Sequence, residues 1–226
     1  MVPSPTSSVQ AQAAFSPQTG CLRRFFIPVL AVLLVCTGLV LGLSRINIAQ
    51  AETTSPLPDT NTASETGGIA PLFTPEVLAW EEQILDWSEK YQLDPNLIAT
   101  VMQIESCGYI QARSHAGAMG LFQVMPYHFL QGEDPFNPAI NAKRGLTYLS
   151  QSLKVGGSSR LALAGYNGGI NGAQNPPESW ADETHRYLYW GLGIYQDAQE
   201  GLAHSPRLEE WLSSGGAALC RLAKGQ

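Results

Sequence analysis

The sequence lacks the short motifs by which many proteins bind nucleotides and metals. It has neither a Walker loop nor a dinucleotide-binding glycine fingerprint. Its histidines are scattered, at His115, His128, His185 and His204, and no His/Cys spacing is typical of a zinc site. We therefore expect no metal and no cofactor.

Basic residues are also scarce. The 13 Lys and Arg residues are outnumbered by 19 Asp and Glu, which gives a net charge of −6. Without the N-terminal Arg23, Arg24 and Arg45, the remainder has 10 basic and 19 acidic residues, or −9. Such a surface argues against nucleic acid or an anionic membrane surface as a partner.

Alternating strand patterns are rare, and apolar residues recur mainly at helical spacing. No internal repeat is evident, and 226 residues suffice for one domain with appendages. We expect a mainly α domain. The expected helices are residues 75–91, 94–106, 136–153, 159–166, 179 or 182 to 195, and 207–222.

The N-terminal region has the pattern of an export signal. Arg23 and Arg24 precede a run without charge, Phe25 to Leu43, which as a helix would span about 28 Å, close to a bilayer core. Arginines ahead of the run predict that the N-terminus stays in the cytoplasm. Ala49-Gln50-Ala51 then resembles a signal-peptidase site. Residues 1–51 are thus a cytoplasmic leader with either a cleaved signal peptide or a retained anchor at 25–43.

Residues beyond 51 are expected to lie outside the cytoplasm. Residues 52–72 are rich in Thr, Ser, Pro and Gly, with few large apolar side chains, and predict a flexible linker. Residues 73–226 are expected to form the folded domain.

Glu105 is the leading candidate for chemistry. Asp94 is a good helix N-cap, Pro95 fits the first helical turn, and Glu105 lies on the edge of the apolar stripe that follows. A carboxyl at a helix C-terminus and against apolar surface should have a raised pKa and can act as a general acid. The alternative is a glutamate that simply emerges at a solvated helix end.

The segments after Glu105 favour a binding site. A loop of small residues at 114–120 leads into Leu121 to Pro126, and Gln123 there carries a donor and an acceptor suited to hydroxyl and acetamido groups. Glu105-Ser106, then GAMGLFQVMP at 117–126 and AGYNGG at 164–169, resemble the signature motifs of soluble lytic transglycosylase catalytic domains. The resemblance runs from about Trp80 to about Tyr195.

The resemblance implies a lysozyme-like α-helical domain with a groove that binds peptidoglycan glycan strands. Glu105 would be the single catalytic acid and base. Ser106 would contact sugar or steady Glu105, and Gln123 would contact an N-acetyl group. Tyr166 would orient Glu105 or the muramoyl residue, Asn167 would fix the loop or touch sugar, and Tyr187 and Glu183 would line the groove. Phe122 replaces a common Met, and Gly165 and Gly168 replace common alanines, which leaves the placement of Tyr166 open.

Three functions stay open at this point. The first is a lytic transglycosylase, expected to act as a monomer, that forms a 1,6-anhydro sugar. The second is a lysozyme-like hydrolase that uses water and a second carboxylate, Asp134 or Glu183. The third is a non-catalytic wall-binding module of an envelope complex. Cys107 and Cys220 either form a disulfide that ties the C-terminal segment behind the Glu105 helix or remain two buried thiols.

Overall fold

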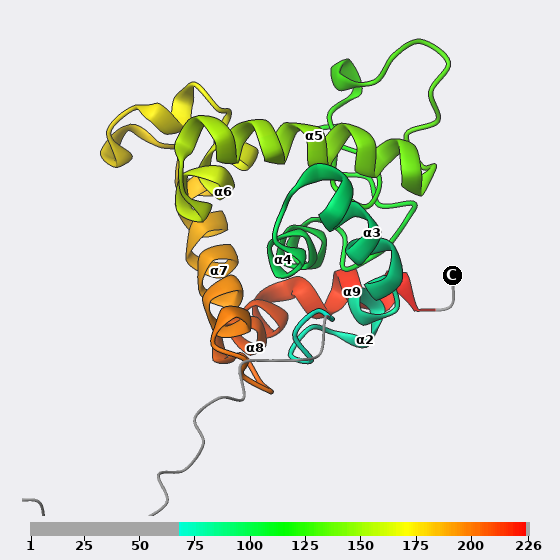
Figure 1. The fold of residues 1–226 in the computed structure, drawn as a ribbon, viewed down its shortest axis with the longest axis vertical. Coiled ribbons are helices and arrows are strands. Elements are labelled where there is room, and N and C mark those ends of the chain that lie inside the picture. The colour runs from blue at the N-terminus through cyan, green and yellow to red at the C-terminus, as the bar shows by residue number, and fades with distance from the viewer. Residues whose placement is uncertain (1–67, 225–226) are drawn as a thin grey trace, which may run out of the picture. The chain divides into compact units, whose positions relative to one another are not determined.

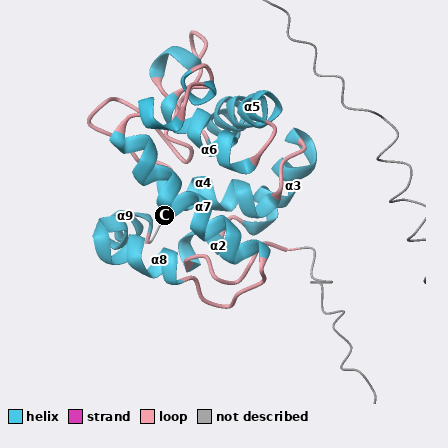
Figure 2. Ribbon diagram, turned by 90° about the vertical axis from the view of Figure 1, so that its left-hand side faces the viewer, coloured by secondary structure: helices cyan, strands magenta, loops and turns pink. Residues whose placement is uncertain are grey.

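The computed structural model describes residues 68–224, which fold as a set of packed helices (Figures 1 and 2). The helices are α2 (Pro75–Leu78), α3 (Glu81–Tyr91), α4 (Pro95–Glu105), α5 (Pro138–Gly156), α6 (Ser159–Gly168), α7 (Asp182–Gln199), α8 (Pro206–Trp211) and α9 (Ala217–Ala223). Within residues 68–224 the only β pairing consists of two isolated bridges, Arg113 with Met119 and Met119 with Val124. The mainly α prediction is confirmed.

Helix α4 lies in the middle of the domain, with α3, α5 and α7 around it (Figure 1). Asp94 caps it as predicted, because its carboxylate accepts from the backbone N–H groups of Asn96 and Leu97. All seven residues from Leu97 to Gln103 are buried, so the helix is enclosed on every side and not only along one stripe. This burial fixes the position of Glu105 at the C-terminal end of α4.

The polar side chains of α4 that are buried have partners. Thr100 donates to the Asn96 carbonyl at 2.7 Å. The Gln103 Oε1 atom accepts from both the backbone N–H and the hydroxyl of Thr74, each at 3.1 Å. Thr74 therefore ties α2 to α4 through its side chain, which makes no capping bond to α2.

Helices α5, α6 and α7 form a second packed group beside α4, since α5 packs on α6, α6 on α7, and α7 on α4. Asn137 caps α5 and Ser158 caps α6 through their side chains. Gly165 and Gly168 allow the close approach of α6. A Cβ at Gly165 would collide with the Ser152 hydroxyl of α5, and one at Gly168 would lie 2.7 Å from the Thr184 hydroxyl of α7. The two glycines therefore tighten the packing of the helix that carries Tyr166.

Three boundaries differ from the predictions. The folded part begins before residue 73, because Ile69, Ala70 and Leu72 are buried in the core although they were assigned to the linker. The helix predicted over 75–91 is interrupted after Leu78 and resumes at Glu81. The helix predicted over 207–222 is α8 and α9 joined by a wide turn at Leu212–Gly216, where Gly215 has φ 128°.

The predicted leader and anchor at 1–51 and most of the predicted linker lie outside the described residues. Among residues 68–224, no helix has both the length and the apolar character needed to cross a membrane.

Candidate active site

A cleft of about 420 Å³ opens at the C-terminal end of α4, and Glu105 lines it. Segments far apart in the sequence form its walls. They are the loop at 114–128, the middle of α5, the end of α6 with the one residue after it, and the start of α7. Of the predicted site residues, Glu105, Gln123, Tyr166, Asn167 and Glu183 all line this cleft.

Glu105 has the electrostatic character of an acid that keeps its proton near neutral pH. Desolvation by the surrounding protein raises its pKa from 4.5 to about 8. The Tyr187 hydroxyl, which can donate to the carboxylate, lowers this pKa in part, and the negative charge of Glu183 raises it further. The predicted direction of the shift is confirmed, and the alternative of a solvated helix end does not hold for this carboxyl.

Tyr187 was expected to line the cleft, but it is only 6% exposed and is not among the residues that line the cleft. Its hydroxyl is buried and makes no hydrogen bond of regular geometry with a protein atom, yet it lies near enough to the Glu105 carboxyl to lower the pKa of that group. Burial and the nearby Glu105 raise the pKa of Tyr187 well above 10. Tyr187 is thus a buried, protonated phenol, positioned to donate when Glu105 ionises.

Tyr166 holds the cleft wall together. Its hydroxyl donates to the Phe122 carbonyl at 2.7 Å, which links α6 to the loop that carries Gln123. Burial, Glu105 and Tyr148 raise the pKa of Tyr166 well above 10, so it also stays protonated. Gly145 makes this contact possible, because a Cβ at that position would lie 2.6 Å from the Phe122 Cβ and 3.0 Å from the Tyr166 hydroxyl.

Gln123 has φ 45°, which turns its side chain back toward the loop. Its amide Nε2 donates to the carbonyls of Ala112 (3.2 Å) and Gly120 (3.0 Å). Both amide hydrogens are therefore used, and Oε1 is the atom of this side chain that can accept from a ligand.

Asn167 and Ser106 have mainly internal partners. The Asn167 Oδ1 atom accepts from the Thr184 hydroxyl at 2.8 Å, which joins α6 to α7 at the edge of the cleft. Ser106 is fully buried and lies outside the cleft lining. Its hydroxyl donates to the Leu121 carbonyl at 2.7 Å and accepts from the Gly108 backbone N–H at 3.1 Å. Ser106 therefore steadies the chain that follows Glu105 and does not face the cleft.

Four further cleft residues, Tyr127, His128, Arg144 and Tyr148, were not among the predicted site residues. Tyr148 is partly buried, and its hydroxyl accepts from the Ile170 N–H at 3.3 Å. None of the four lies in the three motifs that carried the resemblance, so those motifs did not single them out.

The second carboxylate that a hydrolase would need has one candidate at the cleft. Glu183 lines the cleft and acts on the Glu105 pKa. Asp134 does not line it. The Asp134 carboxylate instead accepts from the Phe136 backbone N–H at 2.9 Å, in an exposed turn.

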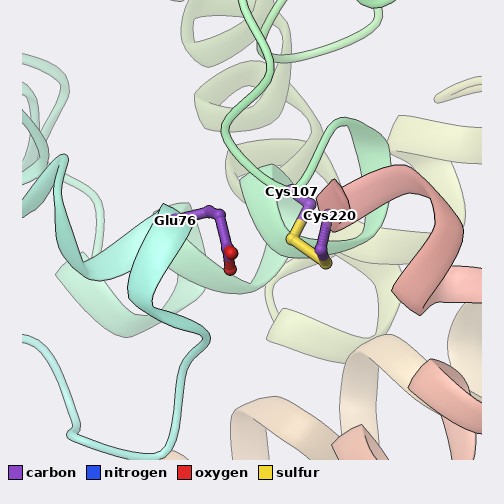
Figure 3. A group of neighbouring side chains, drawn as sticks. All are labelled: Glu76, Cys107 and Cys220. Carbon is purple, nitrogen blue, oxygen red and sulfur yellow. A yellow bond between two sulfur atoms is a disulfide. The ribbon is translucent and has the colours of Figure 1, made fainter. Parts of the chain in front are cut away.

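Cys107 and Cys220 form a disulfide with a Cα–Cα distance of 5.0 Å. Among residues 68–224, Glu76, Cys107 and Cys220 bring potential metal ligands within 4.8 Å of one another (Figure 3). Because a thiolate is the cysteine form that binds metals, the disulfide removes two of these three ligands. The cluster is a cross-link between the end of α4 and α9.

Part of this chain is similar in sequence to transglycosylases. Residues 82–186 match the Transglycosylase SLT domain. A transglycosylase of Enterobacteria phage PRD1 is 38% identical over 112 residues, which cover 49% of this chain and 40% of the phage protein. The chain thus matches less than half the length of that relative. An inactive mutant of the lytic transglycosylase Slt from Pseudomonas aeruginosa aligns with a TM-score of 0.43 and 23% identity, over 56% of this chain and 25% of that one.

The matched segment contains Glu105 and every predicted site residue except Tyr187, which follows its last residue by one position. The segment 82–186 therefore matches the family that the motifs resembled, the Transglycosylase SLT domain.

Proposed function

We propose that this protein is a peptidoglycan lytic transglycosylase that cleaves the β-1,4 bond between N-acetylmuramic acid and N-acetylglucosamine. The observation that carries the proposal is the Glu105 carboxyl, which has a pKa of about 8 and lines a cleft in the segment that matches the Transglycosylase SLT domain. At neutral pH this group holds the proton that the leaving sugar oxygen needs.

Glu105 acts twice in the proposed reaction. It first gives its proton to the glycosidic oxygen as the bond to C1 of the muramoyl residue breaks. The resulting carboxylate then takes the proton of the muramoyl C6 hydroxyl, and O6 bonds to C1. The product is a 1,6-anhydro sugar, no water is consumed, and Glu105 regains its proton.

The neighbours of Glu105 have separate roles. Tyr187 donates to the carboxylate during the interval in which it is ionised, which limits the cost of that charge. Tyr166 fixes the opposite wall through Phe122. The Gln123 Oε1 atom accepts from an acetamido N–H, because its amide hydrogens are bonded to Ala112 and Gly120. Asn167 shapes the edge of the cleft. Ser106 fixes the turn after Glu105, and the negative charge of Glu183 contributes to the electrostatic field around Glu105.

The proposal places the enzyme in the cell envelope, outside the cytoplasm. The disulfide between Cys107 and Cys220 supports this location, because such bonds persist in oxidising compartments. Residues 1–51 would serve as its export signal or anchor at 25–43, and N-terminal sequencing of the exported protein distinguishes a cleaved signal from a retained anchor.

The second candidate function is a hydrolase, which the presence of Glu183 beside Glu105 favours. In that mechanism Glu183 activates water, and the products have reducing ends. Mass spectrometry of the muropeptides released from sacculi separates the two, since the transglycosylase leaves anhydro ends.

The test compares Glu105→Gln with Glu183→Gln. We expect Glu105→Gln to lower cleavage by about 10²- to 10⁴-fold, since the amide has no proton to transfer as an acid. Glu183→Gln should still release anhydro products, at a reduced rate. Full cleavage by Glu105→Gln, or no cleavage by the wild-type protein, would overturn the proposal. Reducing ends that disappear in Glu183→Gln would establish the hydrolase instead.

A further inference from the structure

Four aromatic rings follow one another along the cleft. They belong to Tyr166, Tyr148, His128 and Tyr127, and all four residues line the cleft that holds Glu105. The distances between successive ring centroids are 6.0, 5.1 and 4.6 Å. The rings are tilted against one another by 47° to 59°.

Exposure is greatest at the Tyr127 end of this row. Tyr166 and Tyr148 are partly buried, and the Tyr166 hydroxyl is bonded to the Phe122 carbonyl. Tyr127 at the other end is 76% exposed, more than any other large hydrophobic residue among those described. Its ring adds little to the stability of the core, and so the fold does not explain its presence at the rim.

The loop that carries Tyr127 and His128 is held in place. It connects α4 to α5 and projects beyond α5 at the upper right of Figure 1. Glu133 of this loop forms a two-point ion pair with Arg144 of α5, at 2.6 and 2.8 Å, and also accepts from the Leu130 backbone N–H at 2.9 Å. Arg144 lowers the pKa of Glu133 to about 2, so the pair persists at neutral pH.

The charges of the cleft point to an uncharged ligand. Arg144 is the cation of the cleft lining nearest this loop, and Glu133 already neutralises it. Glu183 lines the same cleft and would repel a phosphate-rich or otherwise strongly anionic polymer. The C–H face of a neutral sugar, in contrast, is attracted to the negatively charged face of an aromatic ring.

We infer that Tyr127, supported by His128, forms an outer sugar-binding subsite that holds a glycan strand at a distance from Glu105. The inference rests on the proposed function for the identity of the polymer. The spacing of the rings is comparable with the length of one sugar unit, so the row can contact successive sugars of one strand. A restrained ring at the rim adds affinity without the cost of ordering a mobile loop.

The test is binding of glycan strands of two lengths to Glu105→Gln protein, which keeps the cleft but not the acid. The strands have two and four disaccharide units, and the second variants are Tyr127→Ala, Tyr127→Phe and Leu130→Ala. Leu130 is the matched control, because its side chain is 64% exposed on the same loop and does not line the cleft.

We expect Tyr127→Ala to weaken binding of the longer strand about five- to twentyfold and to leave the shorter strand within about twofold. Tyr127→Phe and Leu130→Ala should stay within about twofold for both strands, since the first keeps the ring and the second lies off the cleft. These ratios correspond to about 1–2 kcal/mol.

Three outcomes would overturn the inference: an equal loss for both strand lengths, an equal loss in Leu130→Ala, or no loss in Tyr127→Ala. Loss of self-association by Tyr127→Ala in sedimentation would assign the ring to a contact between two copies and overturn it as well. A wild-type protein that binds these strands with the expected length dependence but does not cleave them would overturn the proposed function and leave the subsite intact.

Discussion

Two neighbours of Glu105 influence its pKa in opposite directions. Glu183 raises the pKa through its negative charge, and Tyr187 lowers it by donating to the carboxylate. Because the proposed acid must be protonated, kcat/KM should fall as pH rises through about 8. Glu183→Gln should move this alkaline limb to lower pH, and Tyr187→Phe should move it to higher pH.

The measurement is kcat/KM on soluble glycan strands from pH 5 to 10 at constant ionic strength. Shifts of the same sign in both variants would contradict the arrangement around Glu105. Tyr187→Phe is conservative in shape and leaves the ring in the core, so a change in its pH profile is not explained by lost packing.

The same pKa predicts how stability depends on pH. The folded protein keeps the Glu105 proton up to about pH 8, whereas the unfolded chain releases it near 4.5. The folded state therefore binds more protons between these values, and the free energy of unfolding falls as pH rises through this window. Glu105→Gln has no proton to lose, so it should be more stable than the wild type by about 1–3 kcal/mol at pH 8 and no more stable below pH 4.5.

Urea unfolding at pH 4 and pH 8 measures this difference. Glu89→Gln, on the exposed side of α3, is the matched control for the loss of one carboxylate. An equal stability difference at the two pH values would contradict the raised pKa of Glu105.

At the scale of single elements, the packing of α6 against its neighbours depends on glycines. A Cβ at Gly165 would collide with the Ser152 hydroxyl, which itself donates to the Ala162 carbonyl at 2.9 Å. We expect Gly165→Ala to destabilise the domain by about 1–3 kcal/mol through overpacking, and Ser152→Ala to cost about 1 kcal/mol through the lost hydrogen bond.

The double variant Gly165→Ala/Ser152→Ala should cost less than the sum of the single changes by about 0.5–2 kcal/mol, because the colliding oxygen is gone. Gly172→Ala is the control, since a Cβ there meets no atom within 4 Å. Additive free energies of unfolding would show that α6 does not approach α5 this closely. Tyr166 follows Gly165, so cleavage should also fall in the single Gly165→Ala variant and recover in the double.

Local signals predicted the helices where those signals were strong. Asp94 and Pro95 place the start of α4 correctly, because a cap and a first-turn proline act within a few residues. The turn between α8 and α9 was missed. It depends on Gly216, over which the Trp211 ring lies so closely that a Cβ would collide with it. Contacts of that kind leave no periodic pattern in the sequence.

At the scale of the whole molecule, the cleft is built from segments between residues 105 and 183, and no local pattern says which of their side chains meet. Glu105, Gln123, Tyr166 and Glu183 were found through motifs. Tyr127 and Arg144 were not, because the loop at 126–137 reaches the cleft through its own ion pair. Ser106 belongs to a motif, yet its hydroxyl donates to one backbone group of the protein and accepts from another, and it does not face the cleft.

The disulfide joins parts of the chain that are 113 residues apart, and its stability effect belongs to the whole domain. Cross-linking over so long a loop restricts the unfolded chain, and such bonds contribute about 2–4 kcal/mol. We expect Cys107→Ala/Cys220→Ala to lose this amount in urea unfolding under oxidising conditions. Reduced wild-type protein should lose a similar amount, and a reductant should have no further effect on the double variant.

The Gln103 amide donates to both sulfurs, at 3.1 and 3.6 Å, and the double variant leaves this buried donor without them. Reduced wild-type protein keeps both sulfurs, so the difference between it and the double variant isolates the cost of the unpaired amide from the effect of the cross-link. Equal stability of oxidised and reduced wild-type protein would show that the bond does not constrain the unfolded chain.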